Sequence, residues 1–185
     1  MKIECLKKEY VIDSNWIKVR RDYLSINEKQ TDYYVVEKKD VALVLAFNKN
    51  NEIIIVKEYK YPVDQIMTGI PGGTFSRGEE DPLHAAKREL KEETGCESNE
   101  WELLVKTYEY PTKDTHEIFF YIVRNCVQTA ELQLDENEEL TSQWVPFQNA
   151  INMVMTDEIK HGCTAYALLR CAMLYPELLK PSTIV

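Results

Sequence analysis

Three glutamates near the middle of the chain have the residue type and spacing of a cation site. Glu89, Glu92 and Glu93 stand at positions i, i+3 and i+4, shortly after the glycine pair Gly72-Gly73. On a helix such residues share one face, where like charges repel by roughly 0.2–0.5 kcal/mol per pair. Hard cations such as Mg²⁺ bind carboxylate oxygens and complete their shell with substrate phosphates. This glutamate triplet therefore predicts a divalent-cation site for a polyphosphate, and a solvated acidic helix face is the alternative.

Residues on either side of the triplet predict the helix that must position it. Asp81 and Pro82 form a helix start, and Gly95 follows the helix end, so we expect a helix over about 81–94. Its narrow apolar stripe contains Leu83, Ala86 and Leu90 and leaves the acidic face free. Arg88 lies next to the triplet, where it either holds a carboxylate in place or is a surface arginine four residues before Glu92.

The run Arg88-Glu89-Leu90-x-Glu92-Glu93-x-Gly95-Cys96 resembles the Nudix box of the Nudix hydrolases. Seven residues separate Glu80 from Arg88, as in the family pattern, but six residues instead of five separate Gly73 from Glu80. Choosing Glu79 as the box glutamate would restore the five-residue spacing from Gly73 and break the seven-residue spacing to Arg88. We assign Glu80, because the extra residue then falls in a loop.

Further segments are similar, in the same order, to the ADP-ribose pyrophosphatase branch of that family. They are Trp16–Val19, 40–47, 56–63, 70–73, 134–138, 144–146 and 158–160, with Pro111 sixteen residues after Gly95. Gly69 stands where the branch usually has glutamate, and Lys60 where it has arginine. Lysine lacks the planar fork that binds phosphate through two bonds, so other nucleotide sugars stay open as substrates.

The resemblance implies a metal-dependent reaction at the triplet. Glu89, Glu92 and Glu93, with the backbone carbonyl of Gly72, would bind Mg²⁺, and Mn²⁺ is a possible substitute. Bound metal lowers the pKa of water and stabilises the leaving phosphate. Glu92 and Arg88 are counted with the catalytic residues on this basis.

The branch also uses a carboxylate outside the box to activate water. An ungapped match of residues 134–146 places this carboxylate at Glu138, with Glu136 in reserve. Taken without the resemblance, residues 135–139 are typical of a solvated acidic loop.

The resemblance further implies a homodimer in which the amino-terminal strands reach the partner's site. Trp16 and one of Tyr33 or Tyr34 would then stack on the nucleobase, since aromatic faces bind any base. Packing in a core or an interface is the equal alternative for these rings.

Composition restricts the class of protein. The 185 residues suit one domain over 1–185, with amino-terminal strands for dimerisation over 1–40 and a catalytic core over 41–185. A net charge of −9 argues against nucleic-acid binding. Five cysteines without a Cys-x-x-Cys pair predict reduced thiols, and no apolar run reaches membrane-spanning length, so we expect a cytoplasmic enzyme. The three histidines lack ligand spacing among themselves, so we expect no zinc site.

Apolar periodicity predicts an α/β/α sandwich with a mixed sheet and an amino-terminal strand extension, as the resemblance also implies. The expected strands are 3–11, 15–26, 31–38, 41–48, 52–60, 101–109, 116–124 and 141–145, and two further helices cover 146–156 and 163–175.

We therefore expect a Nudix pyrophosphatase that converts ADP-ribose to AMP and ribose 5-phosphate. Another nucleotide sugar or a dinucleoside polyphosphate is the alternative substrate. A module that senses nucleotides without cleaving them is the non-enzymatic alternative. It is disfavoured because every box acid is present.

Overall fold

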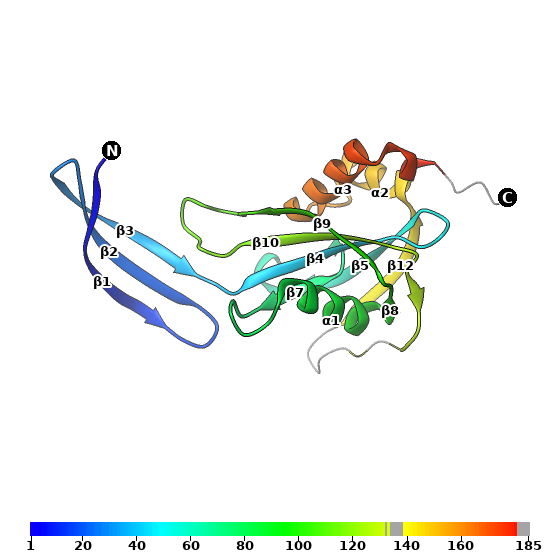
Figure 1. The fold of residues 1–185 in the computed structure, drawn as a ribbon, viewed down its shortest axis with the longest axis horizontal. Helices are drawn as coiled ribbons and strands as arrows, with labels where there is room; N and C mark the ends of the chain where they lie inside the picture. Colours follow the sequence, from blue (N-terminus) through cyan, green and yellow to red (C-terminus); the bar gives the residue numbers. More distant parts are fainter. Residues whose placement is uncertain (132, 134–138, 181–185) are drawn as a thin grey trace.

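The structure is a computed structural model of the 185-residue chain, and it describes residues 1–131, 133 and 139–180. Figure 1 shows an elongated molecule in which an amino-terminal sheet projects from a body of sheets and helices. Within the described residues, no helix is both long enough and apolar enough to cross a membrane.

The projecting sheet consists of β1 (Ile3–Asp13), β2 (Lys18–Ile26) and β3 (Lys29–Glu37), which pair antiparallel in the order β1-β2-β3. Every residue of β1 is exposed in the single chain. This sheet has little apolar cover, and it corresponds to the expected amino-terminal strand extension.

A mixed four-stranded sheet forms the centre of the body, in the order β7-β4-β10-β9. Its members are β4 (Asp40–Ala46), β7 (Gly72–Phe75), β9 (Glu100–Thr107) and β10 (Ile118–Arg124). β4 and β10 pair in parallel, and the other pairs are antiparallel. Both central strands are buried on their two faces, which explains the continuous apolar run from Val41 to Ala46.

A second sheet has the order β12-β5-β6 and packs beside the first. It contains β5 (Glu52–Lys60), β6 (Gln65–Gly69) and β12 (Leu140–Pro146), while β8 (Cys96–Glu97) and β11 (Val127–Gln128) form a small separate pair. A short 3-10 turn, Tyr61–Val63, joins β5 to β6.

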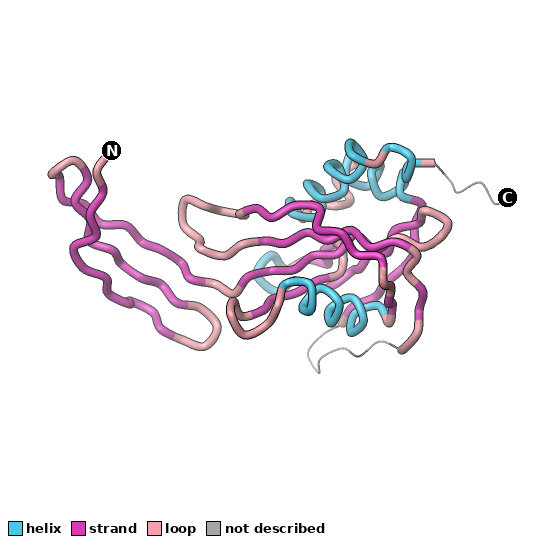
Figure 2. The backbone as a smooth tube through the Cα atoms, viewed as in Figure 1, coloured by secondary structure: helices cyan, strands magenta, loops and turns pink. Residues whose placement is uncertain are grey.

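Helices cover the two sides of this body, as Figures 1 and 2 show. On one side α1 (Pro82–Thr94) buries Ala85, Ala86 and Leu90 against the alanine and valine face of β4. On the other side lie α2 (Phe147–Met155), α3 (Gly162–Leu174) and a final 3-10 turn, Pro176–Leu179. The predicted α/β/α sandwich with a mixed sheet is confirmed.

Four short strands were not expected from the sequence, and one of them changes the description of the site. The glycine pair Gly72-Gly73 opens one of them, strand β7, where Gly72 pairs with Leu43 and Gly73 with Ala42. The pairing comes from a distant strand, so the local sequence carries no alternating pattern that would reveal it.

Candidate active site

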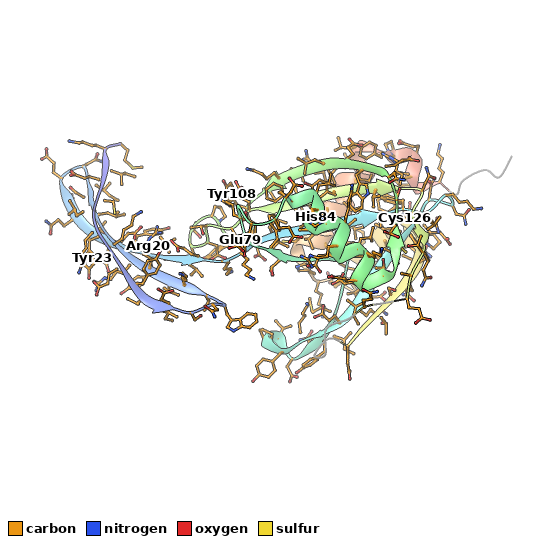
Figure 3. The ribbon with its side chains drawn as sticks, turned by 60° about the horizontal axis from the view of Figure 1, so that its bottom comes forward. Arg20, Tyr23, Glu79, His84, Tyr108 and Cys126 are labelled. Carbon is orange, nitrogen blue, oxygen red and sulfur yellow. The ribbon has the colours of Figure 1, made fainter. Side chains whose placement is uncertain are left out.

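Helix α1 has a defined phase because both of its ends are capped. The Asp81 carboxylate accepts hydrogen bonds from the amides of Leu83 at 2.9 Å and His84 at 3.2 Å, and Gly95 ends the helix with φ 67°. Figure 3 places His84 on this helix and Glu79 in the loop before it. The caps agree with the predicted bounds and turn the triplet toward β7.

Glu93 is the most enclosed member of the triplet. It is 7% exposed, and its Oε2 accepts a hydrogen bond from the Gly72 amide at 2.9 Å. Gly72 has φ 147°, and a Cβ there would lie 2.1 Å from the Ala42 carbonyl oxygen. Only glycine fits this close approach of β7 to β4, and the approach fixes the amide that holds Glu93.

Glu89 lies directly against the second glycine. A Cβ at Gly73 would come within 2.4 Å of Glu89 Oε1, so the carboxylate occupies the space that any other residue would fill. Two of the three predicted ligands, Glu89 and Glu93, therefore lie against the glycine pair.

Arg88 links the acids of the helix to the loop before it. Its Nη1 donates to Glu89 at 2.9 Å and to Glu92 at 3.0 Å, while Nε and Nη2 each lie 3.2 Å from a Glu80 oxygen. The Glu80 hydrogen bond raises the pKa of Arg88, and the same bond holds the pKa of Glu80 below its usual value. The pairing of Arg88 with Glu80 agrees with our choice of Glu80 over Glu79.

A pocket of about 350 Å³ opens beside Glu93 and Gly72. Lys60 lines it at the end of β5 and forms an ion pair with Glu58 at 2.5 Å. His161 lines it from the start of α3, with Nδ1 2.9 Å from Thr164 Oγ1, and burial lowers the pKa of His161, which favours the neutral ring. We call this cavity the Glu93 pocket.

Among the described residues, the three predicted aromatic contacts lie outside the Glu93 pocket of the same chain. Trp16 is 88% exposed in the β1–β2 turn and lines a different hollow with Arg77. Tyr33 donates its hydroxyl hydrogen to the Thr112 carbonyl, and the guanidinium of Arg21 lies over the Tyr34 ring at 5.7 Å. Within a single chain, Lys60 therefore lines the same pocket as Glu93, and the three aromatic rings do not.

Glu136 and Glu138, the expected water-activating residues, lie outside the described residues. The chain on both sides of them is placed near the site. The Gln133 amide donates to the Glu92 carbonyl at 2.8 Å, and Leu140 pairs with Glu58, which lines the Glu93 pocket.

The donors of the triplet suit a hard divalent cation, because they are carboxylate oxygens beside the glycine pair that opens β7. Elsewhere in the described part of the chain, donor atoms of Glu109, Asp114 and His116 all lie within 4.8 Å of one another. We call this set the Glu109 group.

Sequence reasoning missed two features of this region. His161 lines the Glu93 pocket from the residue before α3, and its Nδ1 lies 2.9 Å from Oγ1 of the buried Thr164. The Glu109 group was missed because only spacings between histidines were considered.

Comparisons with known proteins identify the family. The NUDIX domain model matches residues 37–163. An ADP-ribose pyrophosphatase of Bacillus subtilis is 29% identical over 143 residues, 77% of each chain, and a methanol dehydrogenase activator of Bacillus methanolicus is 26% identical over 165 residues, 88% of this chain and 89% of the activator.

A solved structure described as an ADP compounds hydrolase shares the fold. It aligns with a TM-score of 0.84 over 96% of each chain, at 20% identity. The family model covers more than half of the sequence and includes both the triplet and the glycine pair. The chain therefore belongs to the NUDIX domain family and is a Nudix hydrolase.

Proposed function

We propose that this protein hydrolyses the pyrophosphate bond of ADP-ribose and releases AMP and ribose 5-phosphate. The observation that carries the proposal is the position of the triplet: Glu93 and Gly72 line the Glu93 pocket, and Glu89 packs on the next glycine. The acidic face of α1 thus adjoins a cavity of about 350 Å³. The similarity to an ADP-ribose pyrophosphatase over 77% of the chain supports the choice of substrate.

The proposed metal ligands are Glu89, Glu92, Glu93 and the Gly72 carbonyl, with Mg²⁺ as the ion and Mn²⁺ as a substitute. A bound divalent ion supplies charge neutralisation on phosphate oxygens and a lower pKa for water. Arg88 positions Glu89 and Glu92 through its Nη1 hydrogen bonds. Gly72 positions Glu93.

Glu138 is the proposed group that accepts the proton of the attacking water, with Glu136 in reserve. Support comes from the flanking contacts of Gln133 and Leu140, which tie both ends of this segment to the site. Lys60 is the proposed cation for a substrate phosphate, because it lines the same pocket as Glu93.

We further propose one folding domain and a cytoplasmic homodimer. Residues 1–40 would contact the partner and carry Trp16 and Tyr33 or Tyr34 to its nucleobase. The exposure of β1 and Trp16 in the single chain supports a partner there.

Another nucleotide sugar is the second candidate substrate, because of Gly69. Its missing side chain leaves Thr164 Oγ1 and His161 Nδ1 at 3.4 and 3.8 Å from where a Cβ would stand. Of these two, His161 lines the Glu93 pocket and would contact the part of the substrate beyond the pyrophosphate.

The test is phosphate release, coupled to a phosphatase, from ADP-ribose, other nucleotide sugars, dinucleoside polyphosphates and nucleoside triphosphates with Mg²⁺. Preference for ADP-ribose is the expected result, and a Glu93→Gln variant is the inactive control. Preference for another nucleotide sugar would make Gly69 and Lys60 specificity determinants. No release with either Mg²⁺ or Mn²⁺, combined with nucleotide binding, would identify a sensing module.

A further inference from the structure

We propose that the Glu109 group is a second metal site, separate from the triplet, and that it binds a divalent transition ion, with Zn²⁺ as the best fit. Its residues belong to the connection between β9 and β10. The triplet lies on α1, so the two sites share no residue.

The geometry is that of three converging donors. Glu109, Asp114 and His116 each offer one ligand atom, and these atoms lie within 4.8 Å of one another. His116 Nε2 is 3.3 Å from Glu109 Oε2, and Nδ1 is 3.8 Å from Asp114 Oδ2. Three protein ligands leave a fourth position for water, as in many zinc sites.

His116 supplies an independent sign of a missing partner. It is 3% exposed, and within the part of the chain that the structure describes its Nδ1 is buried without a hydrogen bond. A neutral imidazole carries one N–H, so one of its two nitrogens presents a lone pair to a carboxylate, either Nε2 to Glu109 or Nδ1 to Asp114. Two acceptors that face each other need a positive species between them.

The separation favours a metal ion over a shared proton. A hydrogen bond to nitrogen spans about 2.7–3.2 Å, less than the 3.8 Å from Nδ1 to Asp114. Two metal bonds of about 2.0–2.2 Å each can bridge such a gap. The alternative is an imidazolium held between the two carboxylates.

Neighbouring charges leave room for a cation. Lys38 donates a hydrogen bond to Asp114, so its positive charge offsets the charge of the Asp114 carboxylate and not that of Glu109. The Cys163 thiol lies 3.9 Å from Glu109, but burial raises its pKa to about 11, so it is a neutral neighbour. With a neutral imidazole the group keeps a net negative charge.

The donor chemistry and access distinguish this site from the triplet. Imidazole nitrogen suits Zn²⁺ and its transition-metal neighbours, whereas the triplet offers only oxygen. Glu109 is exposed beside a cavity of about 390 Å³ through which an ion can approach. Backbone hydrogen bonds join the same loop to β3, from Val36 N to Lys113 O at 2.8 Å and from Thr115 N to Val36 O at 3.1 Å. Bound metal would brace the attachment of the amino-terminal sheet.

The experiment titrates Co²⁺, as a visible probe, into the full chain in excess Mg²⁺, which occupies the triplet. We expect one Co²⁺ per chain, with an absorption spectrum that indicates a nitrogen ligand and a higher thermal midpoint. Asp114→Asn and His116→Gln should abolish both signals, and Glu109→Gln should weaken Co²⁺ binding at least tenfold. Glu4→Gln, an exposed glutamate on β1, is the matched control and should change nothing.

Glu93→Gln separates this inference from the proposed function, because it should stop hydrolysis and leave Co²⁺ binding intact. Absence of Co²⁺ binding in the native chain would overturn the inference. Binding that survives both Glu109→Gln and Asp114→Asn would also overturn it. Glu109 is exposed, so its variant decides the matter even if His116→Gln fails to fold.

Discussion

At the scale of single residues, Arg88 explains how three acids coexist on one helix face. Its guanidinium contacts Glu80, Glu89 and Glu92 at 2.9–3.2 Å. A lysine could not span them, because an ammonium is a point charge without the planar set of donors. The free chain is thereby stabilised before any metal binds.

Gly73→Ala tests the contact between β7 and the triplet. The new Cβ would stand 2.4 Å from Glu89 Oε1, so the flexible carboxylate must move while the backbone stays in place. We expect the Mg²⁺ concentration for half-maximal turnover to rise at least tenfold, with little change in the free energy of unfolding. Gly162→Ala, whose Cβ meets nothing within 4 Å, is the control. An unchanged Mg²⁺ dependence would contradict the role of Glu89.

Glu138→Gln tests the proposed proton acceptor. Loss of a general base lowers turnover by roughly 10²–10⁴-fold, and metal binding should change little. Turnover of ADP-ribose and Mn²⁺ titration measure the two properties separately. If Glu138→Gln turns over like the native chain, Glu138 has no part in the mechanism and Glu136 becomes the next candidate.

At the scale of elements, the ends of α1 decide where the triplet points. Gly95 ends the helix, and its carbonyl accepts hydrogen bonds from Thr129 at 2.8 Å and Ala130 at 3.2 Å. The cap thus joins α1 to the segment that leads toward Glu138.

Gly95→Ala should be strongly destabilising. The residue has φ 67°, which costs a non-glycine residue about 1–3 kcal/mol, and its Cβ would lie 2.1 Å from the Ala130 carbonyl oxygen. Gly78→Ala is the control, since Gly78 has φ 86° but nothing lies within 4 Å of its Cβ. Urea unfolding should show a larger loss for Gly95→Ala, and equal losses would refute the close packing against Ala130.

Asp40 makes the start of β4 sensitive to acid. Its carboxylate accepts hydrogen bonds from Arg77 at 2.7 and 2.8 Å and from the Glu117 amide at 2.8 Å. Burial by itself would raise the pKa of Asp40, but Arg77 and this amide outweigh burial and hold the pKa below 3.8. The stabilisation is therefore complete above pH 3.8 and is lost as the pH falls toward the folded-state pKa.

Asp40→Asn tests this pH dependence by urea unfolding at neutral pH and below pH 3.8. The native chain should be the more stable at neutral pH, and the difference should shrink in acid, where its own Asp40 becomes protonated. Asp157→Asn, an exposed change, should show no such trend. A difference that stays constant with pH would mean that Asp40 acts through packing alone.

The sequence predicted the elements whose signals are local. Asp81, Pro82 and Gly95 located α1 to within one residue, and the box residues located the triplet. Strand β7 was missed because its partner, β4, lies about thirty residues away. The Glu109 group was missed for a related reason, since Glu109 and His116 meet only when the chain turns between β9 and β10.

At the scale of the whole molecule, the projecting sheet is the feature that a single chain leaves without apolar cover. Trp16 lies in its β1–β2 turn, Tyr33 and Tyr34 lie on β3, and none of the three lines the Glu93 pocket. If these residues serve a partner's site, each complete site requires two chains.

Mixed dimers test that arrangement directly. Glu93→Gln removes a triplet acid, and Trp16→Ala removes an exposed ring. Co-expression of the two variants should give a mixed dimer in which one site has both native residues. We expect more ADP-ribose turnover from the mixture than from either variant alone. As a control, co-expression of the Glu89→Gln chain with the Glu93→Gln chain should show no gain, because each chain then lacks one acid of its own triplet. If the first mixture shows no gain, Trp16 lies outside the partner's site.

The parallel pairing of β4 with β10 also bears on the order of folding. The Glu117 amide reaches Asp40 across 77 residues, whereas β1, β2 and β3 pair with their immediate neighbours in the chain. Contacts between distant residues form slowly, because a long loop must close first. We expect the amino-terminal hairpins to form early and the body to close only after β10 has left the ribosome, so that a nascent chain can present its amino-terminal strands before it has an active site.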